Sequence, residues 1–347
     1  MKKSKYDEEY YKQKNREAEE KVYNILKHYH ENPEEIIEFF QFSSRFYSYS
    51  LNNNLLIFQQ NPEASFVQSF NAWKEMGYSV KRGQHGLDIW LPVNITYINY
   101  NDKWISLRAA DEKAKNAYKE GTLESRKILK FKLGKTYDIS QTTCPLEHYP
   151  KFLKMGQVSE KHSDMIDGLV EYNREYLNTE VIFKDLNSVY LKGYNAVGQN
   201  QIYINNMFGD TEKLSTLIHE TGHQILHQEN QENKSLSQIE FEADAFSVLT
   251  HTYLGLKIED SRKKHMTDNY KKMMEEYKKE REGVDSKEVE YLGNVMNHVM
   301  QTSKTHVRNI TAEIEKKNER HKEKSKKIKF SVPEQKKGHY KSEAIEK

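Results

Sequence analysis

The chain has 347 residues, with 54 Lys and Arg against 52 Asp and Glu and a formal net charge of +2. This length is enough for two domains of ordinary size, each with its own core. The single cysteine, Cys144, excludes an intrachain disulfide and a thiolate-rich metal site. The charged amino terminus and the absence of a long apolar run favour a soluble, cytoplasmic protein with no membrane partner.

The first part of the sequence predicts a polar lead-in followed by a mixed unit. Residues 1–20 are too polar to join a core by themselves and suggest a frayed or helical lead-in. Within the unit expected over 21–142, apolar residues recur at helical spacing over 33–50, and a short helix ends at Asn61-Pro62. Strands are expected in the alternating segments 87–100 and 127–140.

A polar, helix-prone segment, DEKAKNAYKEGTLES, interrupts these strands and predicts a surface insertion between residues 101 and 125. A linker is expected over 143–158, because this stretch has turn residues and no periodicity.

The second part predicts a separate unit over residues 159–260. A helical segment, SDMIDGLVEYNREYLN, precedes three short strand-like segments and a histidine-bearing helix. A charged helical extension is expected over 261–315 and a disordered basic tail over 316–347. The tail has 12 Lys and Arg against 5 Glu, so it could attract DNA in a salt-dependent way or simply be solvated. The order of elements predicts an α+β fold.

Residues 217–227, LIHETGHQILH, carry the clearest chemical pattern. His219 and His223 are four apart, which on a helix separates them by roughly 40° and ~6 Å, close enough for both imidazoles to bind one zinc ion. Glu220 is placed to take a proton from a water at the metal as general base. His227 lies about 12 Å along the axis from His219, too far for three-point chelation.

A third ligand must therefore come from the next helix, IEFEADAFSVL, which offers Glu240 and Glu242. These two carboxylates point to different faces, so only one can easily be a ligand. We expect Glu242, because the apolar stripe would pack this helix under the first and leave Glu242 near the metal. The stripe consists of Ile239, Ala243, Phe246, Val248 and Leu249. The alternative is an amphipathic helix that carries its histidines by chance, which the neighbouring strand and carboxylate helix make less attractive.

Segments between residues 193 and 256, including QIYIN, TLIHETGHQILH and IEFEADAFSVLTHTYLGL, resemble the gluzincin-type metallopeptidase domains of ArdC-type antirestriction proteins and of the ImmA/IrrE family. Gly222 stands where bulkier residues are usual in these domains. The resemblance also implies that QIYIN lies near the edge strand that aligns a peptide. It implies a zinc site and a catalytic base, with His219, His223 and Glu242 as ligands, Glu220 as base, and Asp244 or Glu240 in supporting roles only.

Residues 49–93 and 131–142 resemble the amino-terminal domain of ArdC-type proteins. The resemblance implies binding of single-stranded DNA and protection of incoming DNA from restriction. Such binding needs cations for phosphates and aromatic faces for bases. The candidate phosphate contacts are Lys81, Arg82, Arg45 and Lys74. The candidate stacking residues are Trp73, Tyr47, Tyr49 and Trp90. For Trp73, a place in the core is the stronger alternative, as it is for Phe39, Phe40, Phe42, Phe46, Phe66 and Phe70.

The leading hypothesis is a protein of mobile elements that joins a single-stranded DNA-binding unit to a zinc metallopeptidase acting on an unidentified protein or peptide. A second hypothesis is a DNA-coating protection factor whose zinc site is not catalytic. A third is an ImmA-like protease that cleaves a repressor or defence protein, with an amino-terminal unit that recognises protein.

Overall fold

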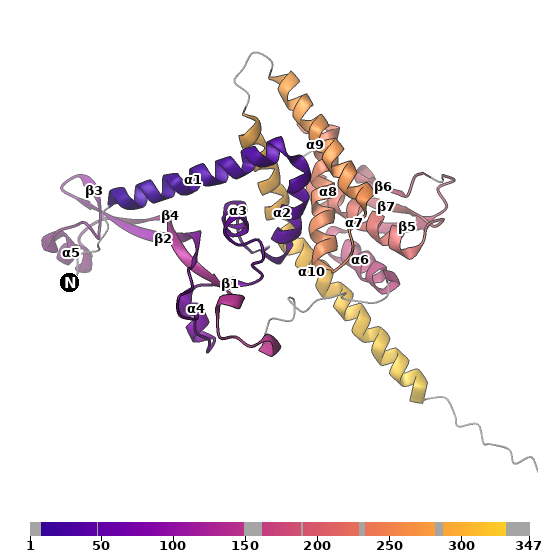
Figure 1. The fold of residues 1–347 in the computed structure, drawn as a ribbon, viewed down its shortest axis with the longest axis horizontal. Coiled ribbons are helices and arrows are strands. Elements are labelled where there is room, and N and C mark those ends of the chain that lie inside the picture. Colours follow the sequence, from indigo (N-terminus) through magenta and orange to yellow (C-terminus); the bar gives the residue numbers. More distant parts are fainter. Residues whose placement is uncertain are drawn as a thin grey trace, which may run out of the picture.

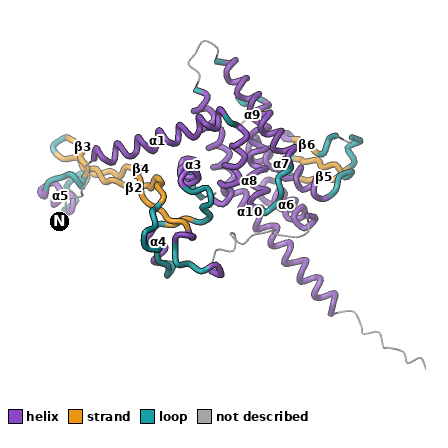
Figure 2. The backbone as a smooth tube through the Cα atoms, in the orientation of Figure 1, coloured by secondary structure: helices purple, strands orange, loops and turns teal. Residues whose placement is uncertain are grey.

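The computed structural model describes residues 8–46, 48–148, 162–188, 190–228, 233–281 and 287–330. It has mixed helices and sheets, as expected, with one sheet in each half of the chain and a group of long helices between them (Figure 1). Figure 2 shows this distribution of helices and strands. Of the expected linker, residues 149–158 lie outside the described residues, as does the part of the expected tail beyond residue 330.

The amino-terminal half begins with a long helix, and no break separates a lead-in from the first unit. Helix α1 runs from Glu8 to Glu31 and buries Ala18, Val22 and Leu26, so the boundary expected at residue 20 falls inside a helix. The other helices of this half are α2 (Ile36–Ser43), α3 (Leu51–Gln60), α4 (Phe70–Glu75) and α5 (Glu112–Lys119).

The first sheet has the order β1-β4-β2-β3 and is antiparallel. Its strands are β1 (Val67–Gln68), β2 (Leu87–Tyr100), β3 (Lys103–Ser106) and β4 (Ser125–Asp138). The two long strands, β2 and β4, form a ribbon whose tip carries β3 and α5 (Figure 1). The polar insertion expected between residues 101 and 125 is therefore confirmed, and a small core around Ile98 and Ala114 holds it to the ribbon.

The second sheet has the order β5-β7-β6, with β7 parallel to β5 and antiparallel to β6. Its strands are β5 (Glu180–Lys184), β6 (Gly193–Ala196) and β7 (Gln201–Asn205). The three expected short strands are present. QIYIN forms the central strand β7 and lies next to the edge strand β6.

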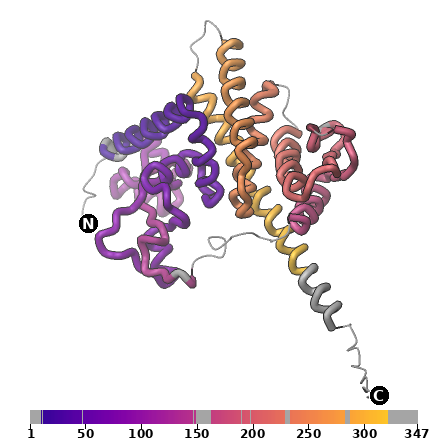
Figure 3. Tube along the Cα trace, turned by 45° about the vertical axis from the view of Figure 1, so that its right-hand side comes forward, coloured from indigo at the N-terminus to yellow at the C-terminus, as the bar shows by residue number. Residues whose placement is uncertain are grey.

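The two halves share a core made by the carboxy-terminal helices, which Figure 3 shows between the two sheets. Helix α10 (Glu288–Phe330) packs Leu292 and Met296 with α1, α2 and α3, and further along packs Ile310 and Ile314 with α6 (His162–Leu177). The described residues of the charged segment expected over 261–315 are mostly helical, and their apolar side chains are part of the core.

The helices pack closely where the chain supplies glycine. A Cβ on Gly168 of α6 would lie 2.6 Å from the Cα atom of Ile314, so this contact requires a residue without a side chain. Residues 316–330, expected to be disordered, continue helix α10. No helix among the described residues is apolar and long enough to cross a membrane.

Candidate metal centre

Helix α7 (Asp210–His227) presents one apolar and one chemically active face. Leu214, Leu217 and Ile218 pack into the core with strand β7. The other face turns His219, Glu220 and His223 toward a cleft of about 680 Å³. The cleft is also lined by β6, by α8 (Leu236–Tyr253) and by α9 (Asp260–Glu280).

Gly222 has a packing role in this site. A Cβ at this position would lie 2.9 Å from the Cδ1 atom of Phe246 on α8, so a larger residue would push the two helices apart. The neighbouring Thr221 hydroxyl accepts a hydrogen bond from the Asn173 side chain on α6 at 2.9 Å. The cost of glycine inside a helix is therefore offset by the close approach that brings the carboxylates of α8 to the histidines.

Two imidazoles and one carboxylate converge at the cleft. The Nε2 atoms of His219 and His223 lie 3.1 Å apart, and the Glu240 carboxylate lies 3.5 Å from the first and 3.6 Å from the second. Among the described residues these three form the group whose donor atoms could hold one metal ion, all within 4.8 Å of one another. Two histidines with one carboxylate are a donor set typical of catalytic zinc sites that keep a position open.

Glu242, expected as the third ligand, is not part of this group. It is fully buried, and its carboxylate accepts hydrogen bonds from His227 at 3.0 Å, from Lys234 at 2.6 Å and from Gln238 at 2.7 Å. Because Glu240 and Glu242 are about 200° apart around α8, only one can face the cleft. The structure brings Glu240 there, which corrects both the ligand expected at Glu242 and the supporting role expected for Glu240.

His219 has a buried carboxylate partner behind it. The Asp244 carboxylate lies 3.1 Å from the Nδ1 atom of His219, and Arg262 and His265 of α9 contact the same carboxylate at 2.9 and 2.7 Å. The Nδ1 atom of His219 also lies 2.8 Å from the Nη1 atom of Arg262. The tautomer that leaves Nε2 able to bind a metal carries its proton on Nδ1, so in that state His219 donates to Asp244 and Arg262 donates to the carboxylate and not to the ring. Sequence reasoning missed Arg262 and His265, because no spacing rule links α9 to the histidine helix.

His223 is held by a different series of hydrogen-bonded side chains. Its Nδ1 atom lies 3.3 Å from the Nδ1 atom of His227, whose Nε2 atom in turn lies 3.0 Å from Glu242. With Nε2 of His223 directed at Glu240, this chain of contacts is satisfied when His223 donates to His227 and His227 donates to Glu242. The third histidine of the motif is therefore buried behind a candidate ligand, as its distance from His219 along the helix predicted.

The two candidate histidine ligands differ in pKa because their surroundings differ. Burial lowers the pKa of His219, but hydrogen bonds to Asp244 and Glu240 outweigh it and raise that pKa to about 9. Burial and the neighbouring His219 lower the pKa of His223 to about 3, which keeps this imidazole neutral. Burial also raises the pKa of the Glu220 carboxyl, a change that makes it a stronger proton acceptor.

The residues expected to contact DNA lie in the other half of the chain. Arg45, Lys74, Lys81 and Arg82 are exposed, and the Lys81 ammonium donates to the Ser140 carbonyl at 3.1 Å. Trp73 is only 1% exposed and its indole N–H donates to the Tyr137 carbonyl at 2.9 Å. Its expected role in base stacking is therefore wrong.

The other stacking candidates are less accessible than the sequence suggested. Tyr49 and Trp90 are partly buried against the core, and Tyr47 lies outside the described residues.

Two family comparisons agree with this arrangement. Residues 5–137 match a family described as the N-terminal domain of anti-restriction factor ArdC, and residues 174–281 match the IrrE N-terminal-like domain. The chain is thus a protein in which an ArdC N-terminal domain precedes an IrrE-like domain. It has the architecture of the ArdC-type antirestriction proteins.

Individual relatives are more distant. An uncharacterized protein of Bacillus anthracis, pXO2-81, is 27% identical over 265 residues, which cover 71% of this chain and 44% of that protein, so the chain spans less than half of its length. Two solved structures of the antirestriction protein ArdC from plasmid R388 are also similar. The metal-free form has 14% identity and a TM-score of 0.42, covering 76% of this chain and 85% of that one. The Mn(II)-bound form has 11% identity and a TM-score of 0.40, covering 78% and 84%.

Proposed function

We propose that this protein acts in antirestriction and combines a single-stranded DNA-binding unit with a zinc-dependent metallopeptidase unit. The description of the amino-terminal domain match supports the antirestriction role. A factor that counters restriction acts where DNA is cut, which supports contact with DNA. The observation that carries the peptidase proposal is the convergence of His219, His223 and Glu240 beside the buried Glu220, at an open cleft.

The donor set fits a divalent metal and favours zinc. His219, His223 and Glu240 would hold the ion, with Asp244 and His227 fixing the two imidazoles from behind. When bound, zinc polarises a substrate carbonyl and lowers the pKa of water, which is the chemistry that hydrolysis of a peptide bond requires.

The residues of the chain account for the proton transfers of this reaction. Glu220 accepts a proton from the attacking water and delivers it to the amine that leaves when the peptide bond breaks. Asn195 of the edge strand β6 donates to the Glu220 carbonyl at 3.1 Å, which fixes the strand against α7. A strand edge next to the cleft is suited to align an extended peptide.

The amino-terminal unit would bring the peptidase to DNA. Arg45, Lys74, Lys81 and Arg82 are exposed cations that can contact phosphates. The protein or peptide substrate would be one met at the incoming DNA.

The test measures zinc content and single-stranded DNA affinity on the same samples of wild type and Glu240→Ala. One zinc per chain in the wild type, lost in the variant with DNA affinity unchanged, is expected. Wild-type protein that takes up no zinc after reconstitution would refute the metallopeptidase proposal.

Glu220→Gln then distinguishes protection that requires peptide hydrolysis from protection by binding to DNA alone. With the same zinc content as wild type, it should produce no new amino termini from a peptide library. Transfer of unmodified plasmid DNA into a restricting host should also fall. Full protection by Glu220→Gln would instead support a factor that protects DNA by coating it.

A further inference from the structure

The cleft at the candidate metal centre gathers exposed apolar side chains. Between residues 162 and 330, six large apolar side chains of the described chain are exposed, and four of them line this cleft. The four are Tyr190 at 92% exposed, Leu236 at 73%, Leu191 at 42% and Tyr194 at 37%. Exposed apolar side chains that gather at one place mark a surface that binds an apolar partner.

One apolar group lies on helix α8, at one end of the metal centre. Leu236 precedes Glu240 by four residues and Asp244 follows it by four, so the three side chains lie in a row with Glu240 in the middle. Asp244 contacts His219. Leu236 therefore lies toward the other end of the site, and Ile239 lines the cleft beside it.

The other apolar group lies toward the start of α7. A Cβ on Gly193 would lie 2.8 Å from the Cγ2 atom of Thr216. Two residues further on, Asn195 donates to the Glu220 carbonyl at 3.1 Å, so β6 runs along α7 in the same direction. Residues before Gly193 therefore lie at the end of the cleft opposite to Leu236. These residues are Tyr190 and Leu191.

Between the two apolar groups, the open edge of β6 can hold an extended peptide. The Lys192 carbonyl accepts a hydrogen bond from the Asn205 amide of β7 at 2.8 Å. Because backbone groups alternate along an antiparallel strand, those of Gly193 and Asn195 point away from β7, and both residues line the cleft. A peptide paired with them would pass the metal centre and reach both apolar groups.

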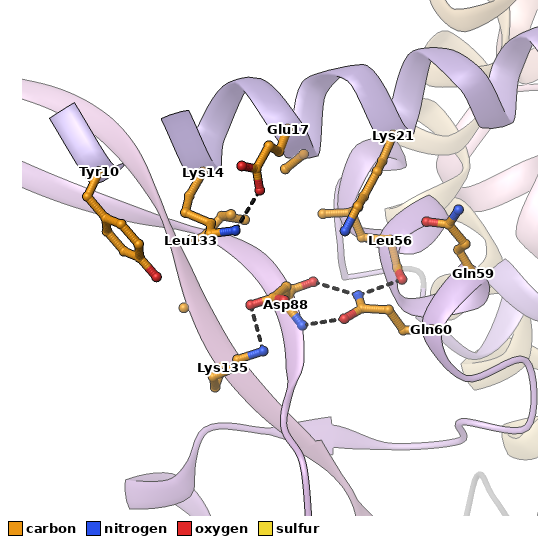
Figure 4. A pocket seen from close by; sticks show the side chains of 12 residues that line it. Tyr10, Lys14, Glu17, Lys21, Leu56, Gln59, Gln60, Asp88, Leu133 and Lys135 are labelled. Carbon is orange, nitrogen blue, oxygen red and sulfur yellow. Dashed lines mark hydrogen bonds and ion pairs between the residues drawn. The ribbon is translucent and has the colours of Figure 1, made fainter. Parts of the chain in front are cut away.

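The cleft between α1 and the ribbon is different. Its wall carries two ion pairs, Lys14 with Glu17 at 2.6 Å and Lys135 with Asp88 at 2.8 Å (Figure 4). An apolar side chain placed there would cover charges that water now solvates, which costs free energy. The apolar surface therefore distinguishes the metal centre from this second cleft.

We propose that the metal cleft selects an extended peptide with a large apolar side chain on each side of the bond that is cleaved. One side chain would pack against Leu236 and Ile239, and the other against Tyr190 and Leu191. The inference rests on the proposed function and names its substrate class. Large apolar side chains are mostly buried in folded proteins, so the substrate would be a segment that is unfolded or has opened.

The first test uses the zinc-loaded full-length protein and a peptide library. Mass spectrometry of the products should show Leu, Ile, Met, Phe or Tyr on both sides of the cleaved bond. In a peptide that is cleaved, replacing either of these residues by Ser should lower kcat/KM about 10- to 100-fold, the factor that corresponds to one buried apolar side chain.

The variants Leu236→Ser and Tyr190→Ser test the two apolar groups. Each should lower kcat/KM for the apolar peptide about tenfold and leave the zinc content unchanged. Met207→Ser is the matched control, because Met207 is 56% exposed but does not line the cleft. In the Glu220→Gln background, the first two variants should also weaken binding of the labelled, uncleaved peptide by a similar factor, measured by fluorescence anisotropy.

Two outcomes overturn the inference and leave the proposed function intact. One is cleavage without a preference for apolar residues, and the other is an effect of Met207→Ser as large as that of the cleft variants. A zinc-loaded wild-type protein that cleaves no peptide of the library would refute the peptidase part of the proposed function as well.

Discussion

The Asp244 carboxylate lies 3.1 Å from the Nδ1 atom of His219, on the side of the ring opposite to Glu240. Such a partner fixes the tautomer and orientation of a metal-binding histidine. We predict that Asp244→Asn lowers zinc affinity about 10- to 100-fold. Competition with a chelator of known affinity measures this. His265→Ala removes another contact of Asp244 and should have a smaller effect, and equal losses in both variants would contradict the assignment.

The His227 side chain should matter for the other ligand. His227→Leu removes the contact at 3.3 Å to His223 and leaves Glu242 with Lys234 and Gln238. We predict that zinc affinity falls about tenfold while zinc content at saturation stays at one ion. Isothermal titration measures both quantities. Complete loss of zinc would instead make His227 a ligand.

The two glutamates of α8 should separate metal binding from stability. Glu240→Ala should abolish zinc binding and change the free energy of unfolding of the metal-free protein little. Glu242→Ala should keep the zinc site but lower that free energy by roughly 3 kcal/mol, because it leaves the partly buried Lys234 and the buried His227 without their carboxylate. Urea unfolding in chelator and zinc titration test the pair. Loss of zinc binding in Glu242→Ala, with zinc binding retained in Glu240→Ala, would make Glu242 the ligand.

The choice between Glu240 and Glu242 also shows which parts of the metal site could be predicted from the sequence. The spacing of His219 and His223 determined their common face, because it depends only on helix geometry. The choice between Glu240 and Glu242 depended on the rotation of α8, which is buried on several sides between two cores. An apolar stripe cannot define one buried face on such a helix. The usable signal was Asp244, four residues after Glu240 and hence on the same face.

The role of the carboxy-terminal helices in the core could not be predicted from the sequence for a related reason. The charged sequence after residue 260 predicted solvated helices, and α9 and α10 are highly charged. Their buried side, however, carries methionines such as Met266, Met273 and Met296. These residues complete a core with α1, α2 and α3, which are far away in the sequence. Local sequence patterns give no information about such long-range partners. The strands of the ribbon and the short strands of the second unit could be predicted, because alternating apolar and polar residues are a local signal.

The shared core predicts that both halves unfold together. All three tryptophans lie between residues 73 and 104, so their fluorescence reports on the amino-terminal half. Phe241 of α8 is fully buried in the shared core, and Phe241→Ala should lower the free energy of unfolding by about 3 to 5 kcal/mol. We expect the fluorescence and circular dichroism transitions in urea to coincide and to shift together. Leu236→Ala, exposed at the start of α8, is the control, and separate transitions would show two independent domains.

Stability should also depend on His251. It is buried near the end of α8, its ring lies 2.8 Å from the Ser247 carbonyl, and burial lowers its pKa to about 4, from the usual value near 6.5. The unfolded chain therefore binds a proton that the folded protein does not, so stability is present above pH ~6.5 and is lost as the pH falls toward 4. Between these values, His251→Gln should reduce the slope of unfolding free energy against pH by up to about 1.4 kcal/mol per unit.

Urea unfolding of the metal-free protein from pH 4.5 to 7.5 measures this slope. His85→Gln, in the exposed turn before β2, is the matched control and should leave the profile unchanged. Because other histidines, such as the partly buried His306, also have a pKa lowered by burial, the variant should keep part of the slope. A slope equal to that of the wild type would mean that His251 takes up its proton in the folded protein as readily as in the unfolded chain.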